Sequence, residues 1–323
     1  AYHRTLSILF VSSPKGKEFP AKHIANPNAT DFIIIETSLP IMNNTALDQM
    51  HFLVLNIGLA QIQGNWNYRN VCSPFSRIYY IHSGYAQIEL PDRIIDLKPH
   101  HLYIIPAFTA HSYICHDSFS HYYIHIYNDS GNDVLEDFEL PYEVEAGKHT
   151  LEQVKRLYEL PQYAPQVYDN RHTLEQYIIK NKQRDLYAKV ESRGLLYLLV
   201  SEFLRFAQPK RYIRDERIAR CIEYIRNEIF TTIELHQLAE IACLSKDHFI
   251  RLFKQEMRVT PLHYINQKKI EKAQLKLITE SCTAKEIAYQ LGYDDHSYFT
   301  RLFKKMTGVT PMEYRKSYYI TNA

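Results

Sequence analysis

A repeat near the C-terminus constrains the fold of this chain more than any other feature of its sequence. Residues 251–254 and 301–304 both read Arg-Leu-Phe-Lys, with an offset of fifty residues. Val-Thr-Pro follows each copy, at residues 259–261 and 309–311. Self-similarity at a fixed offset indicates two copies of one structural unit, so the C-terminal third is expected to contain a duplicated motif.

The second copy follows local rules for two helices joined by a tight turn. Thr283 and Glu286 form a T-x-x-E capping box that starts a helix. Gly292 ends that helix, because glycine adopts positive φ at little cost. The next helix begins at about Asp295, and its apolar residues at i, i+3 and i+4 predict one buried stripe, formed by Phe299, Leu302 and Phe303.

The first copy has the same pattern. One helix begins at about Glu234 and a second near Ser245, and their inward residues are Leu235, Leu238, Ala239, Ala242, Phe249, Leu252 and Phe253. Cys243 and Arg258 stand where the second copy has glycine. If those turns need positive φ, each of these residues costs roughly 1 kcal/mol. Helix, short turn and helix is the helix-turn-helix motif, whose second helix lies in the major groove of DNA.

The exposed faces of the two second helices supply the candidate DNA contacts. Arginine pairs bidentately with guanine, so Arg251 and Arg301 are candidates for base recognition, with phosphate contact or a surface ion pair as the alternative. The residues expected to carry more of the sequence preference are Lys246, Asp247, Ile250, His296, Ser297 and Thr300. The residues expected to contact phosphates are Lys254, Lys304 and Lys305.

Residues 214–316 resemble the DNA-binding domain of AraC/XylS-type transcription regulators. The segment IAYQLGYDDHSYFTRLFKKMTGVTPMEYR, residues 287–315, is close to the family signature. The resemblance implies promoter DNA and RNA polymerase as partners. Between the two units, Thr260 and Pro261 predict the start of a connecting helix that runs to about Ile278 and is roughly 25 Å long. Its candidate packing positions are Leu262, Ile265, Ile270, Ala273 and Leu277.

Charge and cysteine usage are consistent with a nucleic-acid partner and a reducing compartment. Residues 208–323 contain 20 Lys/Arg and 14 Asp/Glu, whereas residues 1–207 contain 18 and 22. A basic half beside an acidic half favours DNA binding by the basic one. Five cysteines without a C-x-x-C pair indicate reduced thiols. No long apolar run or signal peptide is found, so a cytoplasmic protein without a membrane partner is expected.

The segment from about residue 31 to residue 128 has an all-β pattern, with short β-branched and aromatic runs about ten residues apart, which predicts a sandwich or barrel. A strand is expected at residues 31–37, and hairpin turns at Ser83-Gly84 and Asp92-Arg93. In the resembling family a cupin-like barrel that binds a small effector occupies this position. LKPHHLYIIPAFTAHSY, residues 97–113, resembles the second cupin motif, with Phe108 where that motif often has glycine.

A metal site and a cofactor are not expected in this barrel. A cupin metal site needs an H-x-H pair around residues 77–89, and none is present. His121 and His125 share a strand face but are too far apart to be adjacent ligands. We therefore expect no metal, no cofactor and no enzymatic activity.

Effector binding without a metal fits better. Strand alternation places Tyr80 with His82, His111 with Tyr113, and Tyr123 with His125 on common faces, which are taken to point inward. Imidazoles and phenols suit a sugar or another polar metabolite. In a sugar-responsive member of the resembling family, positions that match His82, Tyr113, Tyr123 and His125 line the effector pocket. The alternative is that these tyrosines are core or edge residues. Trp66 is expected to pack in a loop.

The middle of the chain is helical, at residues 149–160, 174–182 and 185–206, with a loop at 161–166. The last helix is apolar nearly all round and must be buried on several sides. It packs on the barrel or, as in the resembling family, pairs two subunits into a homodimer. A linker then leads to a helix with Ile218, Cys221, Ile222 and Ile225 inward.

The predicted fold class is α+β with several domains. These are an effector-sensing cupin-like barrel at 1–147, a helical coupling and dimerisation segment at 148–207, a linker at 208–213 and a double helix-turn-helix domain at 214–323. The predicted function is effector-controlled, sequence-specific transcription regulation. The alternatives are a cupin metal-dependent enzyme fused to DNA-binding helices, and a constitutive DNA binder without an effector.

Overall fold

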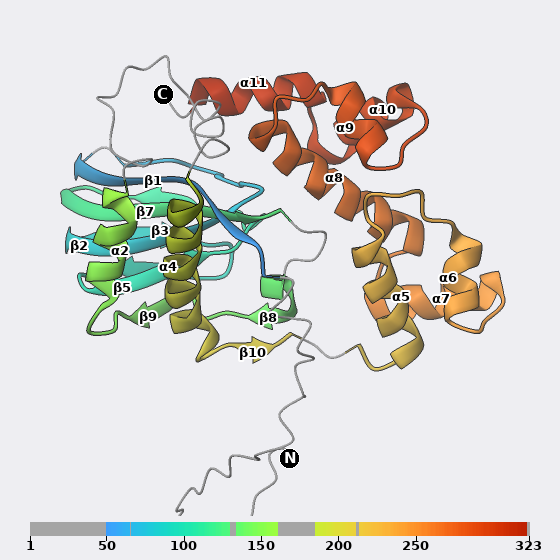
Figure 1. The fold of residues 1–323 in the computed structure, drawn as a ribbon, viewed down its shortest axis with the longest axis horizontal. Helices are drawn as coiled ribbons and strands as arrows, with labels where there is room; N and C mark the ends of the chain where they lie inside the picture. The colour runs from blue at the N-terminus through green and yellow to red at the C-terminus, as the bar shows by residue number, and fades with distance from the viewer. Residues whose placement is uncertain (1–49, 65, 130–133, 161–184, 211–212, 322–323) are drawn as a thin grey trace, which may run out of the picture. The chain divides into compact units, whose positions relative to one another are not determined.

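The computed structural model describes residues 50–64, 66–129, 134–160, 185–210 and 213–321, without the side chains of the last three (Figure 1). The strand expected at 31–37, the loop at 161–166 and the helix at 174–182 lie outside these residues.

Residues 50–145, called the two-sheet region below, form two antiparallel sheets. The five-stranded sheet has the order β1-β7-β2-β5-β9 and the three-stranded sheet the order β4-β3-β6. The first contains β1 (Phe52–Gln63), β7 (Ser118–Asn128), β2 (Ser76–Gly84), β5 (His101–Ile105) and β9 (Glu143–Glu145), and the second β4 (Ile94–Leu97), β3 (Ala86–Glu89) and β6 (Ser112–Ile114).

One buried core lies between the sheets. Tyr79 and Tyr103 enter it from the five-stranded sheet, and Ile88 and Tyr113 from the three-stranded sheet. The inward residues of β2 and β7 are odd-numbered, since Tyr79 pairs in register with Tyr123 and Arg77 with His125. Side chains alternate across a strand, so this register fixes which residues can meet in the interior.

One of the two expected hairpin turns is wrong. At Asp92-Arg93 the turn joins the paired strands β3 and β4, and the Leu90 amide donates to the Arg93 carbonyl at 2.8 Å. At Ser83-Gly84 the chain instead passes from one sheet to the other, since β2 and β3 are not paired. Gly84 has φ +84°, and a Cβ there would lie 2.0 Å from the Ser118 carbonyl oxygen. Glycine therefore permits a crossing between sheets.

Two helices lie across one face of the five-stranded sheet (Figure 1). They are α2 (Thr150–Glu159) and α4 (Leu186–Leu204), which confirms two of the three helices expected in the middle of the chain. The ring of Tyr158 in α2 packs edge-on against Tyr122 of β7 at 5.5 Å. The expected linker begins with β10 (Gln208–Pro209), which pairs with β8 (Phe138–Glu139) after the short helix η1 (Val134–Asp137).

The C-terminal part is helical, as expected. Its helices are α5 (Glu216–Asn227), α6 (Leu235–Ile241), α7 (Lys246–Met257), α8 (Pro261–Thr279), α9 (Ala284–Gln290), α10 (His296–Thr307) and α11 (Pro311–Thr321). The capping box at Thr283 and Glu286 is present. The side chain of Thr260 accepts from the His263 amide at the start of α8, with Pro261 in its first turn. The predicted boundaries of the connecting helix are therefore confirmed, although Leu262, expected to pack, is exposed because it lies on the outer side of the first turn.

The turns of the two copies match in backbone conformation. Gly292 has φ +69° and its counterpart Cys243 has φ +53°, while Gly308 has φ +84° and its counterpart Arg258 has φ +66°. The condition set out from the sequence, that these turns need positive φ, is therefore met, and the first copy keeps the turn geometry with residues that tolerate it poorly. Over the described residues, no helix is both long and apolar enough to cross a membrane.

Candidate nucleic-acid interface and effector site

Helices α7 and α10 are held in the same way. Phe249 and Phe253 of α7 are fully buried in one cluster with α5 and α6, and Phe299 and Phe303 of α10 are fully buried in another with α8 and α9. The aromatic residues are one turn apart, so they fix one face of each helix against its own core. The opposite face of each helix remains for a partner.

Most of the residues expected to contact DNA lie on those opposite faces. The exposed ones are Lys246, Asp247, Arg251, Lys254, Ser297, Arg301, Lys304 and Lys305. Ile250, His296 and Thr300 are half-buried. Ile250 packs against the first cluster, and the Thr300 hydroxyl donates to the His296 carbonyl at 2.9 Å. For Thr300 this leaves the methyl group as the part suited to a base contact.

A buried lysine joins the two helix-turn-helix-shaped units. Lys269 in α8 has 4% of its surface exposed. Its Nζ donates to the Thr231 carbonyl beside the first unit and to the Leu291 carbonyl in the second, both at 2.6 Å. The Thr232 hydroxyl also donates to the Gly292 carbonyl at 3.0 Å. These bonds connect the loop before α6 to the turn between α9 and α10.

Burial lowers the pKa of Lys269 to about 8, so the ammonium remains the main form at pH 7. Sequence reasoning missed this residue, although its position indicated burial. Lys269 lies four residues after Ile265 and four before Ala273, both of which are buried. On a helix those positions share one face.

The interior of the two-sheet region contains four of the six predicted effector residues. His111, Tyr113, Tyr123 and His125 all lie on inward faces of their strands or bridges. His111 Nε2 is 2.7 Å from the Tyr113 hydroxyl, and that hydroxyl is 2.5 Å from the Tyr79 hydroxyl. Trp66 is buried and stacks on Tyr113 at 4.1 Å, in keeping with its expected packing role.

The assignment of Tyr80 and His82 to that interior is a correction. Tyr80 lies on the outer face of the five-stranded sheet, where its hydroxyl is 3.3 Å from His100 Nδ1 and its ring packs against Tyr122. His82 is exposed at a register shift between Ile81 and Ser83. The inward face of β2 carries Arg77, Tyr79 and Ile81 instead. Side chains do alternate between the two faces of β2, but the even-numbered face was predicted to point inward and the odd-numbered face does so.

Sequence reasoning also missed Arg77, Tyr79 and His121 as interior residues. The indication was a charged residue within the apolar run SRIYYI, on the same face as Tyr79. Burial lowers the pKa of His111 to about 4, that of His121 to about 3 and that of His125 well below its usual range. These imidazoles are therefore neutral at pH 7 and act as one donor and one acceptor each. No group of three or more metal-ligating side chains occurs in the described part of the chain.

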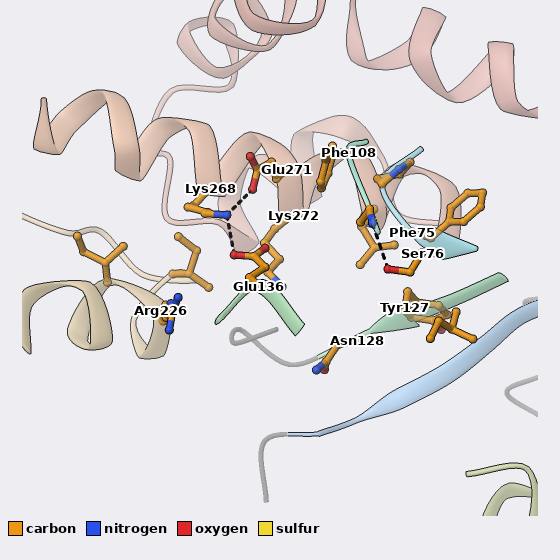
Figure 2. A pocket seen from close by; sticks show the side chains of 16 residues that line it. Phe75, Ser76, Phe108, Tyr127, Asn128, Glu136, Arg226, Lys268, Glu271 and Lys272 are labelled. Atoms are coloured by element: carbon orange, nitrogen blue, oxygen red, sulfur yellow. Dashed lines mark hydrogen bonds and ion pairs between the residues drawn. The ribbon is translucent and has the colours of Figure 1, made fainter. Parts of the chain in front are cut away.

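A pocket lies beside the two-sheet region, lined by Ser76 of β2, Tyr127 of β7 and Glu136 of η1 together with residues of α5 and α8 (Figure 2). Lys268 Nζ is 2.7 Å from Glu136 and 2.9 Å from Glu271. Arg226 forms an ion pair with Asp137. The main charged side chains of the pocket are thus paired within the chain, which disfavours the pocket as a site for a charged ligand.

Comparison with known proteins identifies the C-terminal domain. Residues 238–317 match the family model described as a helix-turn-helix domain. The chain is 25% identical over 213 residues to the uncharacterized HTH-type transcriptional regulator YdeC of Bacillus subtilis, an alignment that covers 64% of this chain and 68% of the relative. It is 30% identical over 102 residues to the arabinose operon regulatory protein of Escherichia coli, covering 31% of this chain and 35% of that relative.

A solved structure gives a similar local match. The C-terminal domain of AraT, a response regulator from Geobacillus stearothermophilus, is 31% identical, with 31% of this chain and 84% of that chain covered and a TM-score of 0.31. The alignment with the arabinose operon regulatory protein covers only about a third of that protein's length. Residues 238–317 are thus an AraC-type helix-turn-helix domain, and the relatives that the chain resembles are transcriptional regulators of the AraC/XylS family.

Proposed function

We propose that this chain regulates transcription at specific promoters, using two helix-turn-helix units to bind successive segments of the major groove. α6 with α7 forms the first unit, and α9 with α10 forms the second. The observation that carries the proposal is their matched design. Each second helix buries a phenylalanine pair and exposes an arginine, Arg251 or Arg301, at equivalent positions. A 19-residue helix, α8, separates the units, and at 1.5 Å per residue it spans roughly 28 Å. That length suits segments about one helical turn apart.

The two-sheet region is proposed to be a cupin-like barrel that binds a small effector. Its support is an enclosed interior with neutral imidazoles and phenols, among them His111, Tyr113, Tyr123 and His125. The arabinose operon regulatory protein is a sugar-operon regulator by name, and its alignment covers only 31% of this chain. The identity of the effector therefore has to come from the chemistry of the interior.

A homodimer is proposed to form through α4. Leu186, Tyr187, Val190 and Leu198 are at least half exposed on this helix, and a Cβ at Gly194 would meet nothing within 4 Å. These residues recur at intervals of about four, so they form one apolar stripe that a second copy of α4 could cover. The proposed domains are 1–147, 148–207, 208–213 and 214–323, and RNA polymerase is the proposed partner at the promoter.

Selection from random-sequence DNA tests the proposal. The full chain should enrich a site with two half-sites, and Arg251→Ala and Arg301→Ala should each relax the base preference of a different half. Lys304→Ala should weaken binding to all sequences alike and reduce the slope of log affinity against log salt by about one. Lys155→Ala on α2 is the matched charge control. A chain that enriches no sequence would refute DNA recognition, and unchanged preferences in both variants would refute the two-unit arrangement.

Effector control is tested separately, with and without a candidate ligand. Binding that is indifferent to every ligand would favour a constitutive DNA binder, and one bound transition metal per chain would favour the enzyme.

A further inference from the structure

Arg77 is a cation placed among neutral groups on the inward face of β2. Its Nη1 is 3.2 Å from His125 Nε2, and its Nη2 donates to the Ser73 hydroxyl at 2.7 Å. The Phe75 ring lies 5.0 Å from its guanidinium carbon. Within the described part of the chain, none of the recorded ion pairs involves Arg77. A half-buried guanidinium without a carboxylate loses part of its hydration, and no opposite charge compensates that loss.

The hydrogen-bond inventory around Arg77 lacks acceptors. Arginine only donates, so His125 Nε2 must accept from it and the imidazole proton lies on His125 Nδ1. That Nδ1 is buried with no partner, and so is Nε of Arg77. His125 itself is 9% exposed. Two adjacent side chains thus each keep a buried N–H group without an acceptor, a rare condition in proteins.

The hydroxyls of Tyr79 and Tyr113 lie within hydrogen-bond reach of the Arg77 side chain. They bond to each other, and Tyr113 also bonds to His111. Both hydroxyls are neutral, so they do not compensate the charge of Arg77, and its Nε stays without an acceptor. A neutral sugar could occupy the free donors but would leave the guanidinium charge uncompensated. An oxyanion supplies both the missing acceptors and the missing charge, and a planar carboxylate matches the guanidinium fork.

We propose that the effector is a small organic anion whose carboxylate or phosphate group binds Arg77 and His125 at the inward face of β2 and β7. This inference rests on the proposed effector function of the two-sheet region and names the chemical class of its ligand. It narrows the expectation of a sugar or another polar metabolite to an anionic one. Because Arg77 lies at the start of β2 and is only half-buried, the anionic group approaches from that end of the strand.

Thermal unfolding of the full chain tests the class of ligand without knowledge of its identity. The probes are matched pairs at constant ionic strength: benzoate with benzamide, acetate with acetamide, and D-xylonate with D-xylose, together with inorganic phosphate. At least one anion should raise the Tm of the wild type by about 2 °C or more, while its neutral analogue does not. A rise in Tm with a carboxylate but not with phosphate, or the reverse, shows which kind of oxyanion the site binds.

Variants then locate the site. Arg77→Gln should abolish the anion-specific shift, and Arg77→Lys, which keeps the charge but loses the fork, should retain only part of it. Arg93→Gln is the control, because Arg93 is exposed, forms an ion pair with its neighbour Asp92 and lies over the Tyr142 ring. The comparison of each anion with its neutral analogue uses the wild type alone, so it tests whether the site prefers an anion even if Arg77→Gln does not fold.

The inference is overturned if no anion exceeds its neutral analogue in the wild type, or if Arg77→Gln responds to anions as the wild type does. A neutral probe that stabilises both proteins equally would show an effector site for uncharged ligands. DNA selection by the same wild-type protein reports independently on the proposed function, so each proposal can fail without the other.

Discussion

Two cations that lose hydration on folding, the buried Lys269 and the half-buried Arg77, have opposite surroundings. Lys269 donates to two backbone carbonyls and lies 5.0 Å from the Tyr293 ring centroid, so its charge is satisfied within the fold. Arg77 keeps a buried Nε without an acceptor. Both lose hydration on folding. Lys269 recovers it from two carbonyls, whereas Arg77 bonds to His125 and Ser73 but keeps one N–H group without an acceptor. A satisfied cation serves to hold parts of the structure together, whereas an unsatisfied one is suited to a ligand.

Buried imidazoles give the stability a defined pH dependence. Burial lowers the pKa of His121 to about 3, and an unfolded histidine titrates near 6.5. Between these values the unfolded state binds more protons than the folded state. The contribution of His121 to the free energy of unfolding is therefore fully present above pH 6.5 and decreases as the pH is lowered toward 3. His111 and His125 act in the same direction.

The substitution His121→Phe isolates one contribution, because Phe119 and Trp66 pack against this ring and its Nδ1 has no partner. It should reduce the loss of stability between pH 7 and pH 5 by roughly 2 kcal/mol. Urea unfolding at both pH values measures the difference. A variant with the full wild-type loss would contradict burial of a neutral His121.

At the scale of elements, the two copies of the motif place different residue types at equivalent turns, so the effect of residue type on stability can be compared within one chain. Arg258 ends α7 with φ +66°, and Gly308 ends α10 with φ +84°. A Cβ at Gly308 would meet no atom within 4 Å, so only backbone strain distinguishes the residue types there.

Arg258→Gly should therefore raise the free energy of unfolding by about 0.5–1 kcal/mol, and Gly308→Ala should lower it by about 1 kcal/mol. Chemical denaturation of both variants measures the two shifts, each serving as the control for the other. Shifts of the same sign would show that contacts, rather than φ, determine stability at these turns.

For the whole molecule, the proposed function implies that the relative placement of the two units sets which DNA spacing binds. Lys269 and the Thr232–Gly292 bond connect them across the middle of α8. A Cβ at Gly292 would lie 2.4 Å from the Thr231 carbonyl carbon, so the two segments are in close contact.

Lys269→Met keeps most of the side-chain volume but removes both hydrogen bonds. It should cost about 1–3 kcal/mol of stability, because the buried Leu291 carbonyl and the Thr231 carbonyl both lose a donor. It should also widen the range of half-site spacings that the protein selects from random DNA. Lys155→Met is the control, since Lys155 is exposed and lies on α2, outside both units. If Lys269→Met selects one spacing as strictly as the wild type, other contacts hold the units together.

The sequence by itself determined the helical half of this protein, including the caps at Thr283 and Thr260 and the positive φ at Cys243 and Arg258. These features depend on residues within one or two turns, and capping, φ restriction and the i, i+3, i+4 stripe are local effects. The same rules placed His111, Tyr113, Tyr123 and His125 on common strand faces.

Only the tertiary structure decided which face of β2 is inward and how Arg77 and Lys269 are surrounded. The alternation of side chains defines two faces of a strand but does not say which face meets the other sheet. No sequence signal marks the crossing between the sheets at Gly84 or the register shift beside His82. Whether a buried cation finds acceptors depends on groups brought together from distant segments. Arg77 meets His125 across 48 residues, and Lys269 meets Thr231 across 38. Those neighbours exist only once the chain has folded.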